Sequence, residues 1–189
     1  MLKRWANLVM CMKTVAAKLW VGVVLVIGVV LSGCMEGFAG PMPREGEVAP
    51  EFVGIDAWVN SEPLSLQALR GKVVLVEFWT YSCVNCLRTL PHVNKWYDKY
   101  RDQDFVVVGV HTPEYEHEHG LASLESAVQR LGIDFPVAQD NSYATWRAYE
   151  NRFWPAQYLI DKQGRIVRTH YGEGEYEETE EAIRKLVKG

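Results

Sequence analysis

Two cysteines separated by two residues, Cys83 and Cys86, are the pair of side chains in this sequence best suited to chemistry. A cysteine thiolate is both a nucleophile and a metal ligand, so such a pair can attach haem, bind zinc, form a structural disulfide or exchange disulfides. Haem attachment requires a histidine directly after the second cysteine, and Leu87 stands there. A structural disulfide across so short a loop would restrict the unfolded chain very little.

Zinc is the weaker of the two remaining uses. A structural zinc site needs four ligands. The other two cysteines, Cys11 and Cys34, lie within the first 34 residues, so histidines or carboxylates would have to complete the site. We therefore favour a redox-active dithiol, which requires no metal and no cofactor beyond a reversible disulfide between Cys83 and Cys86.

The segments on either side of the pair predict where it lies. VVLVEFW, residues 73–79, is typical of a strand buried on both faces in a parallel sheet. Apolar residues then recur at helical spacing over residues 87–100, and Pro91 inside this pattern predicts a kink. Cys83 would thus lie where a helix begins, and there free backbone amides and the helix dipole lower the pKa of a thiol. Cys86, one turn later, would be more buried and act as the resolving thiol.

Alternating strand and helix patterns fill the rest of the chain. The expected strands cover residues 105–110 and 135–140, and two further β-rich runs flank a turn signal at 161–164. The expected helices cover residues 121–132, 143–150 and 175–189. This alternation predicts an α/β fold.

The N-terminal segment has the pattern of an export signal. Four basic residues and no acidic one precede residues 19–31, an apolar run too short for a comfortable membrane span. The run ends in LSGC, residues 31–34, which resembles the lipobox of bacterial lipoproteins and implies that Cys34 is lipidated and becomes the new N-terminus. An uncleaved signal anchor is the alternative, and both place the following domain outside the cytoplasm.

The chain therefore divides into three predicted parts. A lipoprotein signal peptide covers residues 1–33, a Gly- and Pro-containing tether covers 34–46, and one domain covers 47–189. Of 20 basic and 24 acidic residues, the part after residue 34 keeps 16 basic and all 24 acidic, a formal net charge of −8. This charge disfavours nucleic acid as a partner and leaves no polybasic membrane patch. We expect a membrane-anchored lipoprotein on the periplasmic or cell-surface side.

Several motifs in a fixed order resemble those of one family. They are WTYSCVNCLRTLP, GVHTPEY, YATWRAYENRFWPAQYLID and YGEGEYEETE. Over residues 47–189 they resemble the exported thiol oxidoreductases of the TlpA/ResA and redoxin group, and most closely the extracytoplasmic thioredoxin domain of DipZ-type proteins. The resemblance implies a thioredoxin-like fold, with a central mixed sheet flanked by helices and an added N-terminal β segment.

The resemblance also implies roles for individual residues. Cys83 would be the attacking cysteine and Cys86 the resolving one, and Pro155 would be a cis proline facing the dithiol. Glu77 occupies the position of a buried acid beneath the resolving cysteine. An acid inside an apolar strand is costly unless it is paired or protonated, so we expect a pKa raised by burial and proton exchange with Cys86. The alternative is an ordinary surface or edge position for Glu77.

Three aromatic residues near these positions are candidates for a substrate groove. Trp79 and Tyr81 precede the cysteines, and Trp154 precedes Pro155. Aromatic rings next to a reactive thiol can bind the apolar part of a substrate. We expect Trp79, Tyr81 and Trp154 to line this groove, in part from the core.

The predicted function is a thiol:disulfide oxidoreductase that acts on protein or small-molecule disulfides, apocytochrome c being one possible substrate. The family likeness favours a reductase over an oxidase, although Val84 and Asn85 between the cysteines give no indication of the potential, and Ser82 replaces the tryptophan of thioredoxin. DipZ-type proteins carry a membrane electron-transfer domain that this chain lacks. A separate membrane thiol donor resembling CcdA or DsbD would therefore supply electrons.

Two other functions remain as alternatives. Thr80, three residues before Cys83, matches a peroxiredoxin pattern and suggests a thiol-dependent peroxidase, although Val76 stands where that pattern has proline. A copper-binding thioredoxin-like chaperone would also use two cysteines, usually separated by three residues, with a distant histidine. His111 follows an expected strand, and either local packing or a role near the site would explain it.

The segment EYEHEHG, residues 114–120, could suggest a metal site because it combines histidines with acids. Its pattern fits a loop or a helix start better than a strand that would align both imidazoles. We expect a solvated polar loop here.

Overall fold

The computed structural model of the chain describes residues 45–189. The described residues belong to one compact unit, Gly40–Gly189. The predicted signal peptide, lipidated Cys34 and most of the tether lie outside them. Among the described residues, no helix combines the length and apolar character needed to cross a membrane.

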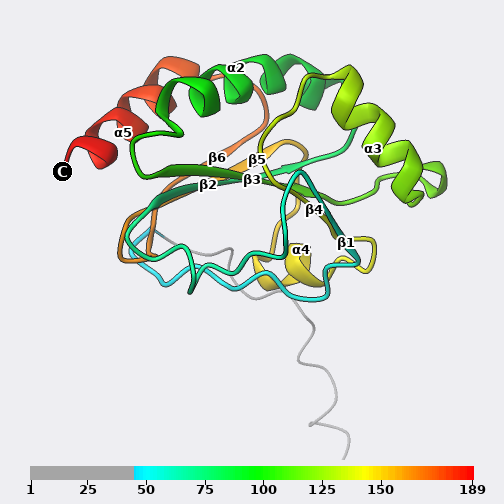
Figure 1. Ribbon diagram of the computed structural model, residues 1–189, viewed down its shortest axis with the longest axis horizontal. Helices are drawn as coiled ribbons and strands as arrows, with labels where there is room; N and C mark the ends of the chain where they lie inside the picture. Colours follow the sequence, from blue (N-terminus) through cyan, green and yellow to red (C-terminus); the bar gives the residue numbers. More distant parts are fainter. Residues whose placement is uncertain (1–44) are drawn as a thin grey trace, which may run out of the picture. The chain divides into compact units, whose positions relative to one another are not determined.

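A six-stranded mixed sheet forms the centre of the domain (Figure 1). Its strand order is β1-β4-β3-β2-β5-β6. β2 is parallel to β3, and β3 to β4, whereas the pairs β1–β4, β2–β5 and β5–β6 are antiparallel. The strands are β1 (Ala57–Val59), β2 (Val73–Trp79), β3 (Phe105–His111), β4 (Val137–Gln139), β5 (Ala156–Ile160) and β6 (Ile166–Tyr171).

Helices cover both faces of this sheet (Figure 1). Helices α2, α3 and α5 lie over one face, and the short α4 lies over the other with the segments that lead into β1 and β2. The helices are α2 (Val84–Tyr100), α3 (Leu121–Arg130), α4 (Ala144–Ala148) and α5 (Tyr176–Lys188), with a 3-10 helix η1 (Glu116–Glu118). The expected mixed sheet, its flanking helices and the added N-terminal strand are confirmed.

β2 is buried along its whole length, and its side chains alternate between two cores. Val73, Leu75 and Trp79 pack into the cluster that also contains Cys86 of α2. Val74, Val76 and Phe78 pack into the second cluster, with Tyr149 and Tyr158. This alternation places Glu77 on the same face of the sheet as Cys86.

Helix α2 begins at Val84, three residues before the start of the predicted apolar pattern, and continues through Pro91. Proline removes one helical hydrogen bond, but most of this helix is held by packing rather than by propensity. Cys86, Leu90, Val93 and Trp96 are all buried on its inner face.

Gly109 of β3 lies directly beside Glu77 in the parallel register. A Cβ atom at this position would lie 2.8 Å from Cε2 of Phe135 and 2.9 Å from Nε1 of Trp79. Both rings therefore reach over the strand only because residue 109 has no side chain.

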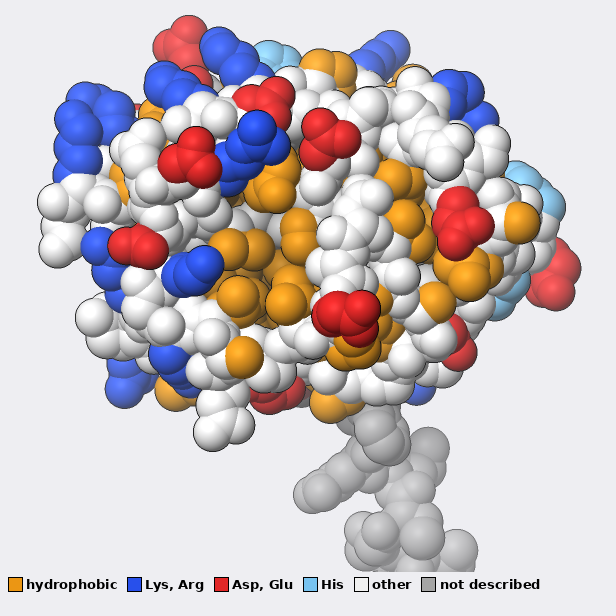
Figure 2. Space-filling model, in the orientation of Figure 1, with side chains coloured by type: hydrophobic (Ala, Val, Ile, Leu, Met, Phe, Trp, Pro, Cys, Tyr) orange, Lys and Arg blue, Asp and Glu red, His pale blue; other side chains and the backbone are white. Residues whose placement is uncertain are grey.

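Charges of both signs are interspersed on the face of the domain shown in Figure 2, around a central area of hydrophobic side chains. A stripe of one sign would be needed to bind a nucleic acid backbone. The viewed face has no such stripe.

Candidate active site

Cys83 is the N-cap residue of α2, and its side chain is half-buried. Its sulfur accepts a hydrogen bond from the Cys86 backbone amide at 3.3 Å. The pKa of Cys83 is lowered to about 7, chiefly by a hydrogen bond from the Cys86 thiol. Burial opposes this shift, and the backbone amides of Cys86 and Asn85 add to it. A large fraction of Cys83 is therefore thiolate at neutral pH.

Cys86 has the opposite environment. Its side chain is fully buried in the core cluster beneath α2. Burial and the neighbouring Cys83 raise the pKa of its thiol, and a hydrogen bond with the Thr80 backbone only partly offsets this. Both cysteines are free thiols, and the pair consists of one half-buried nucleophile and one buried proton donor.

Glu77 is fully buried. No hydrogen bond of normal geometry reaches either carboxyl oxygen from the described residues. Burial raises the pKa of Glu77 to about 8, the nearby Gln157 side chain lowers it, and the charge of Cys83 raises it further. The surface or edge alternative for Glu77 is wrong, because β2 is a central strand flanked by β3 and β5.

The peptide bond between Trp154 and Pro155 is cis, as the family resemblance implies. Ala156 pairs with Phe78, so Pro155 lies at the same edge of the sheet as the loop that leads to Cys83. The Trp154 indole is half-buried, donates a hydrogen bond to the Thr112 carbonyl at 3.0 Å and packs against the cluster containing Cys86. The structure thus brings the dithiol, Pro155 and Trp154 to one edge of the sheet.

Trp79 does not line a substrate groove, and that expectation is corrected. Its side chain is 0% exposed, because the alternation of β2 directs it into the core under α2. Its position next to the reactive loop in sequence does not place it on the surface.

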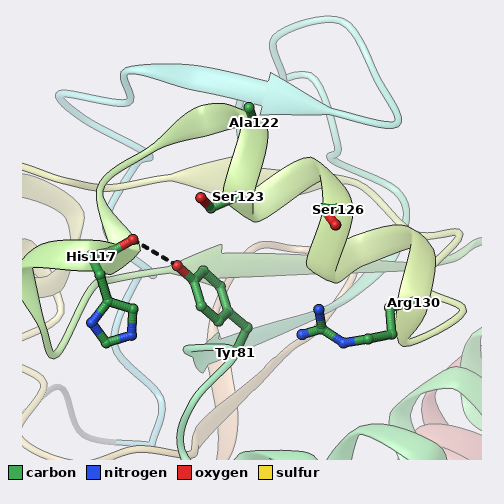
Figure 3. A pocket seen from close by; sticks show the side chains of 6 residues that line it. All are labelled: Tyr81, His117, Ala122, Ser123, Ser126 and Arg130. Carbon is green, nitrogen blue, oxygen red and sulfur yellow. Dashed lines mark hydrogen bonds between the residues drawn. The ribbon is translucent and has the colours of Figure 1, made fainter.

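Tyr81 does reach the surface. Its ring stacks on His111 with centroids 5.4 Å apart, and its hydroxyl donates to the His117 carbonyl at 2.9 Å. It forms one wall of a depression of about 470 Å³ that Figure 3 shows beside α3. The other lining residues are His117, Ala122, Ser123, Ser126 and Arg130. In Figure 3 the Arg130 side chain extends toward the Tyr81 ring, so a substrate bound here would contact a cation and an aromatic ring.

His111 is fully buried between Trp79, Tyr81 and Thr80. Burial lowers its pKa to about 4, although the charge of Glu118 opposes this shift. His111 is therefore neutral at physiological pH and packs behind the loop that precedes Cys83. Within residues 45–189 no group of three or more His, Cys, Asp or Glu side chains is arranged to hold a metal ion.

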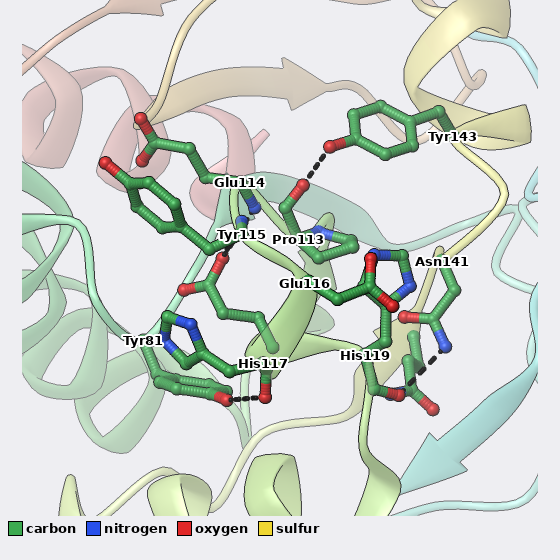
Figure 4. Close-up of polar contacts among 11 residues, drawn as sticks. Tyr81, Pro113, Glu114, Tyr115, Glu116, His117, His119, Asn141 and Tyr143 are labelled. Atoms are coloured by element: carbon green, nitrogen blue, oxygen red, sulfur yellow. Dashed lines mark hydrogen bonds and ion pairs between the residues drawn. The ribbon is translucent and has the colours of Figure 1, made fainter.

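Segment 114–120 is not simply a solvated loop, because Glu118 inside it is 0% exposed. Its carboxylate accepts hydrogen bonds from Thr80 and Ser82, which lie three residues and one residue before Cys83. The sequence carries no clear signal for this contact. Glu118 directly follows the exposed residues Glu116 and His117, and it is 36 residues from Ser82. Figure 4 shows how the surrounding segment is also tied by Tyr81 to His117 and by Tyr143 to Pro113.

Comparison with known proteins gives consistent relatives. A family model described as Redoxin matches residues 44–186. Protein DipZ of Mycobacterium bovis is 47% identical over 160 residues, which make up 83% of this chain and 23% of DipZ. Thiol-disulfide oxidoreductase YkuV of Bacillus subtilis is 32% identical over 138 residues, covering 73% of this chain and 93% of YkuV. The chain therefore spans less than a quarter of DipZ but nearly all of YkuV.

Solved structures agree on the fold. The crystal structure of the thioredoxin-like superfamily protein SPOA0173 has a TM-score of 0.69 and 30% identity, and the match covers 75% of this chain and 97% of that protein. The expected thioredoxin-like fold is thereby confirmed.

Proposed function

This chain belongs to the Redoxin family, and we propose that it is an exported, membrane-tethered thiol:disulfide oxidoreductase that reduces protein disulfides. The observation that carries this proposal is the pair of opposite thiol environments. Cys83 is half-buried at a helix N-terminus with a pKa of about 7, and Cys86 is buried and protonated. Relatives named thiol-disulfide oxidoreductase, among them YkuV, support the same reaction class.

The proposed reaction transfers two electrons from the dithiol to a substrate disulfide. The Cys83 thiolate attacks one substrate sulfur, a Cys83–substrate disulfide forms, and the other substrate sulfur leaves as a thiolate. Cys86 then loses its proton and attacks the Cys83 sulfur. This second step releases the second substrate thiolate and leaves a Cys83–Cys86 disulfide. Overall, the proton lost by Cys86 and one proton from solvent balance the charges of the two substrate thiolates.

Glu77 would serve the second step as a proton acceptor. It lies on the Cys86 face of β2, and with a pKa of about 8 a fraction of it is ionised near neutral pH and can accept the Cys86 proton, which it then passes on. Pro155 and Trp154 would form the wall against which the mixed disulfide lies. Tyr81 would hold the substrate chain on the other side.

Tethering and electron supply belong to the same proposal. The lipobox-like sequence at Cys34 supports a lipid anchor outside the cytoplasm, and the tether would let the domain reach membrane partners. Regeneration of the dithiol requires two electrons, which a membrane thiol donor resembling CcdA or DsbD would provide. Apocytochrome c or another exported disulfide protein would be the substrate.

The experiment that tests the reaction uses the full-length chain and insulin as a disulfide substrate. Cys83→Ser should abolish reduction, and Cys86→Ser should accumulate a mixed disulfide that mass spectrometry detects. Continued turnover by Cys83→Ser would overturn the assignment. Faster consumption of hydrogen peroxide than of insulin would favour a peroxidase instead.

The direction of electron flow is tested by the reduction potential of the Cys83/Cys86 couple. Equilibration with thiol buffers and a count of free thiols by mass gives this value. A potential near that of thioredoxin, about −270 mV, supports a reductase. A potential near about −120 mV would mean that the protein inserts disulfides.

A further inference from the structure

We propose that Glu118 is a positioning residue of the dithiol, whose buried carboxylate fixes the Thr80–Ser82 turn and so holds the Thr80 backbone against Cys86 for the resolving step. The inference rests on the proposed dithiol exchange. Nothing in the sequence pattern singles this residue out, and the contacts of its two carboxyl oxygens carry the argument.

The first oxygen of Glu118 binds the turn that leads to Cys83. It accepts hydrogen bonds from the Thr80 hydroxyl, from the Ser82 hydroxyl at 2.5 Å and from the Ser82 backbone amide at 3.3 Å. Two of these donors are the side chains of Thr80 and Ser82, which are two residues apart. One carboxylate oxygen therefore sets the orientation of both side chains. Tyr81 between them is held separately by its own bond to His117.

The second oxygen of Glu118 binds the segment on which the residue itself lies. It accepts from the backbone amides of Glu114 at 2.5 Å and Tyr115 at 2.9 Å. These bonds prevent the carboxylate from turning away from the Thr80–Ser82 turn. All five partners are donors, and an ionised carboxylate, which only accepts, matches them.

Burial makes this arrangement demanding. Glu118 is 0% exposed, and an isolated buried carboxylate would be strongly unfavourable. Burial raises its pKa, but the hydrogen bonds from Ser82, Thr80 and the two backbone amides outweigh it, so the net shift is downward. Glu118 is therefore a charged anchor at neutral pH.

The link to the chemistry passes through Thr80. The Thr80 hydroxyl binds Glu118, and the backbone of the same residue lowers the pKa of Cys86 against the larger upward effects of burial and of Cys83. If the turn relaxes, this stabilisation is lost while the Cys83 contacts to α2 remain. The first attack should then be almost unaffected, and the resolving attack should slow.

The same segment also reaches the opposite wall of the site. The Thr112 amide donates to the Trp79 carbonyl at 3.1 Å, and the Thr112 carbonyl accepts from the Trp154 indole at 3.0 Å. Residues 112–118 thus contact both the turn before Cys83 and the residue before Pro155. Loss of the Glu118 contacts would release the turn before Cys83 and leave the contact with Trp154 in place.

The test separates the two chemical steps in the full-length reduced chain. An aromatic disulfide such as 5,5′-dithiobis(2-nitrobenzoate) releases one coloured thiolate when Cys83 attacks and a second when Cys86 resolves the mixed disulfide. For Glu118→Gln, we expect the first release within about twofold of wild type and the second about tenfold slower, a loss of ~1.4 kcal/mol.

Glu116→Gln is the matched control, because it makes the same chemical change on the same 3-10 helix at a fully exposed side chain. Both releases should stay at the wild-type rate in this variant. The proposal is overturned if Glu118→Gln slows both steps equally, slows neither, or behaves like Glu116→Gln. If Cys83→Ser loses both releases and Glu118→Gln keeps wild-type kinetics, only the role of Glu118 is rejected. If Cys83→Ser still turns over, the proposed function itself is rejected.

A second variant keeps the test valid if Glu118→Gln does not fold. Thr80→Val preserves the shape of Thr80 and removes its hydroxyl, which contacts both Glu118 and Nε2 of His111, so it should also slow the second release. Thr80→Ser keeps the hydroxyl and should give the second release at the wild-type rate. When Glu118→Gln and Thr80→Val both fold, the variant that combines them should release the second thiolate no more slowly than the slower single variant, because the two groups act through one contact. A wild-type second release in Thr80→Val would contradict the proposal.

Discussion

At the scale of single residues, the two thiols differ because one caps a helix and the other lies inside the core. The position of Cys83 at the start of α2 and the burial of Cys86 follow from the apolar run before the pair and the helical spacing after it. The sequence could not indicate that the largest cause of the lowered Cys83 pKa is the thiol of Cys86 itself. That cause leads to a specific experiment.

Replacing Cys86 should change the acidity of Cys83 according to the group left behind. Cys86→Ala removes the hydrogen-bond donor, so the pKa of Cys83 should rise from about 7 toward the ordinary thiol value. Cys86→Ser retains a donor and should keep the pKa of Cys83 lower than the alanine variant does. The measurement is the rate of iodoacetamide alkylation of Cys83 against pH. Equal midpoints in the alanine and serine variants would contradict this explanation.

Glu77 should make the folded domain less stable as pH rises. Its folded pKa of about 8 lies above the ordinary 4.5, so between these values the folded state keeps a proton that the unfolded state has lost. Stability from this group is complete below pH 4.5 and declines as pH rises toward 8. Glu77→Gln should therefore be more stable than wild type at pH 7 by roughly 3 kcal/mol relative to the difference at pH 4.

Chemical denaturation of both proteins at pH 4 and pH 7 measures this difference. The exposed Glu125→Gln on α3 is the control and should change stability by less than about 0.5 kcal/mol at either pH. Glu77→Gln should also resolve mixed disulfides more slowly, since it cannot accept a proton. A Glu77→Gln protein whose stability advantage is the same at both pH values would show that the buried carboxyl does not titrate as described.

At the scale of elements, β3 shows how one missing side chain fits two rings against the strand. Gly109→Ala would bring a methyl group within 2.8 Å of Phe135 and 2.9 Å of the Trp79 indole nitrogen. Neither ring can retreat in a packed core, so we expect a destabilisation of about 1–3 kcal/mol by denaturation. Gly120→Ala, where the nearest atom is Ser123 Oγ at 3.4 Å, is the comparison and should cost less. Equal losses would exclude overpacking as the cause.

The elements themselves were largely predictable, because long apolar runs and helical spacing reflect burial directly. β2, α3 and α5 begin or end within two residues of the predicted bounds. Trp79 and Glu118 differ in this respect. The burial of Trp79 agrees with the predicted strand 73–79, buried on both faces, and conflicts only with the groove expected from its nearness to the cysteines, whereas the burial of Glu118 depends on a contact 36 residues away in sequence. Nearness in sequence favours a groove position for Trp79 and a solvated loop for Glu118. Tertiary packing instead places Trp79 in the core and buries Glu118 against the turn before Cys83.

At the scale of the whole molecule, the proposed lipid anchor decides where the acidic domain works. Cys34→Ser should stop incorporation of labelled palmitate and move the full-length chain from the membrane fraction to the soluble fraction in a bacterial host. The physical reason is that lipid chains on Cys34 supply the membrane affinity that a cleaved signal peptide no longer gives. A variant that stays in the membrane fraction without palmitate would instead indicate an uncleaved signal anchor.

The unequal acidity of the two thiols also sets how the redox poise of the protein follows its surroundings. Below a pH of about 7, reduction of the disulfide takes up two protons with two electrons. The midpoint potential of the couple therefore becomes more negative by about 59 mV for each unit by which pH rises. Above that pH Cys83 stays ionised, only Cys86 takes up a proton, and the slope halves to about 30 mV. The domain is thus a weaker electron donor as pH falls and a stronger one as pH rises.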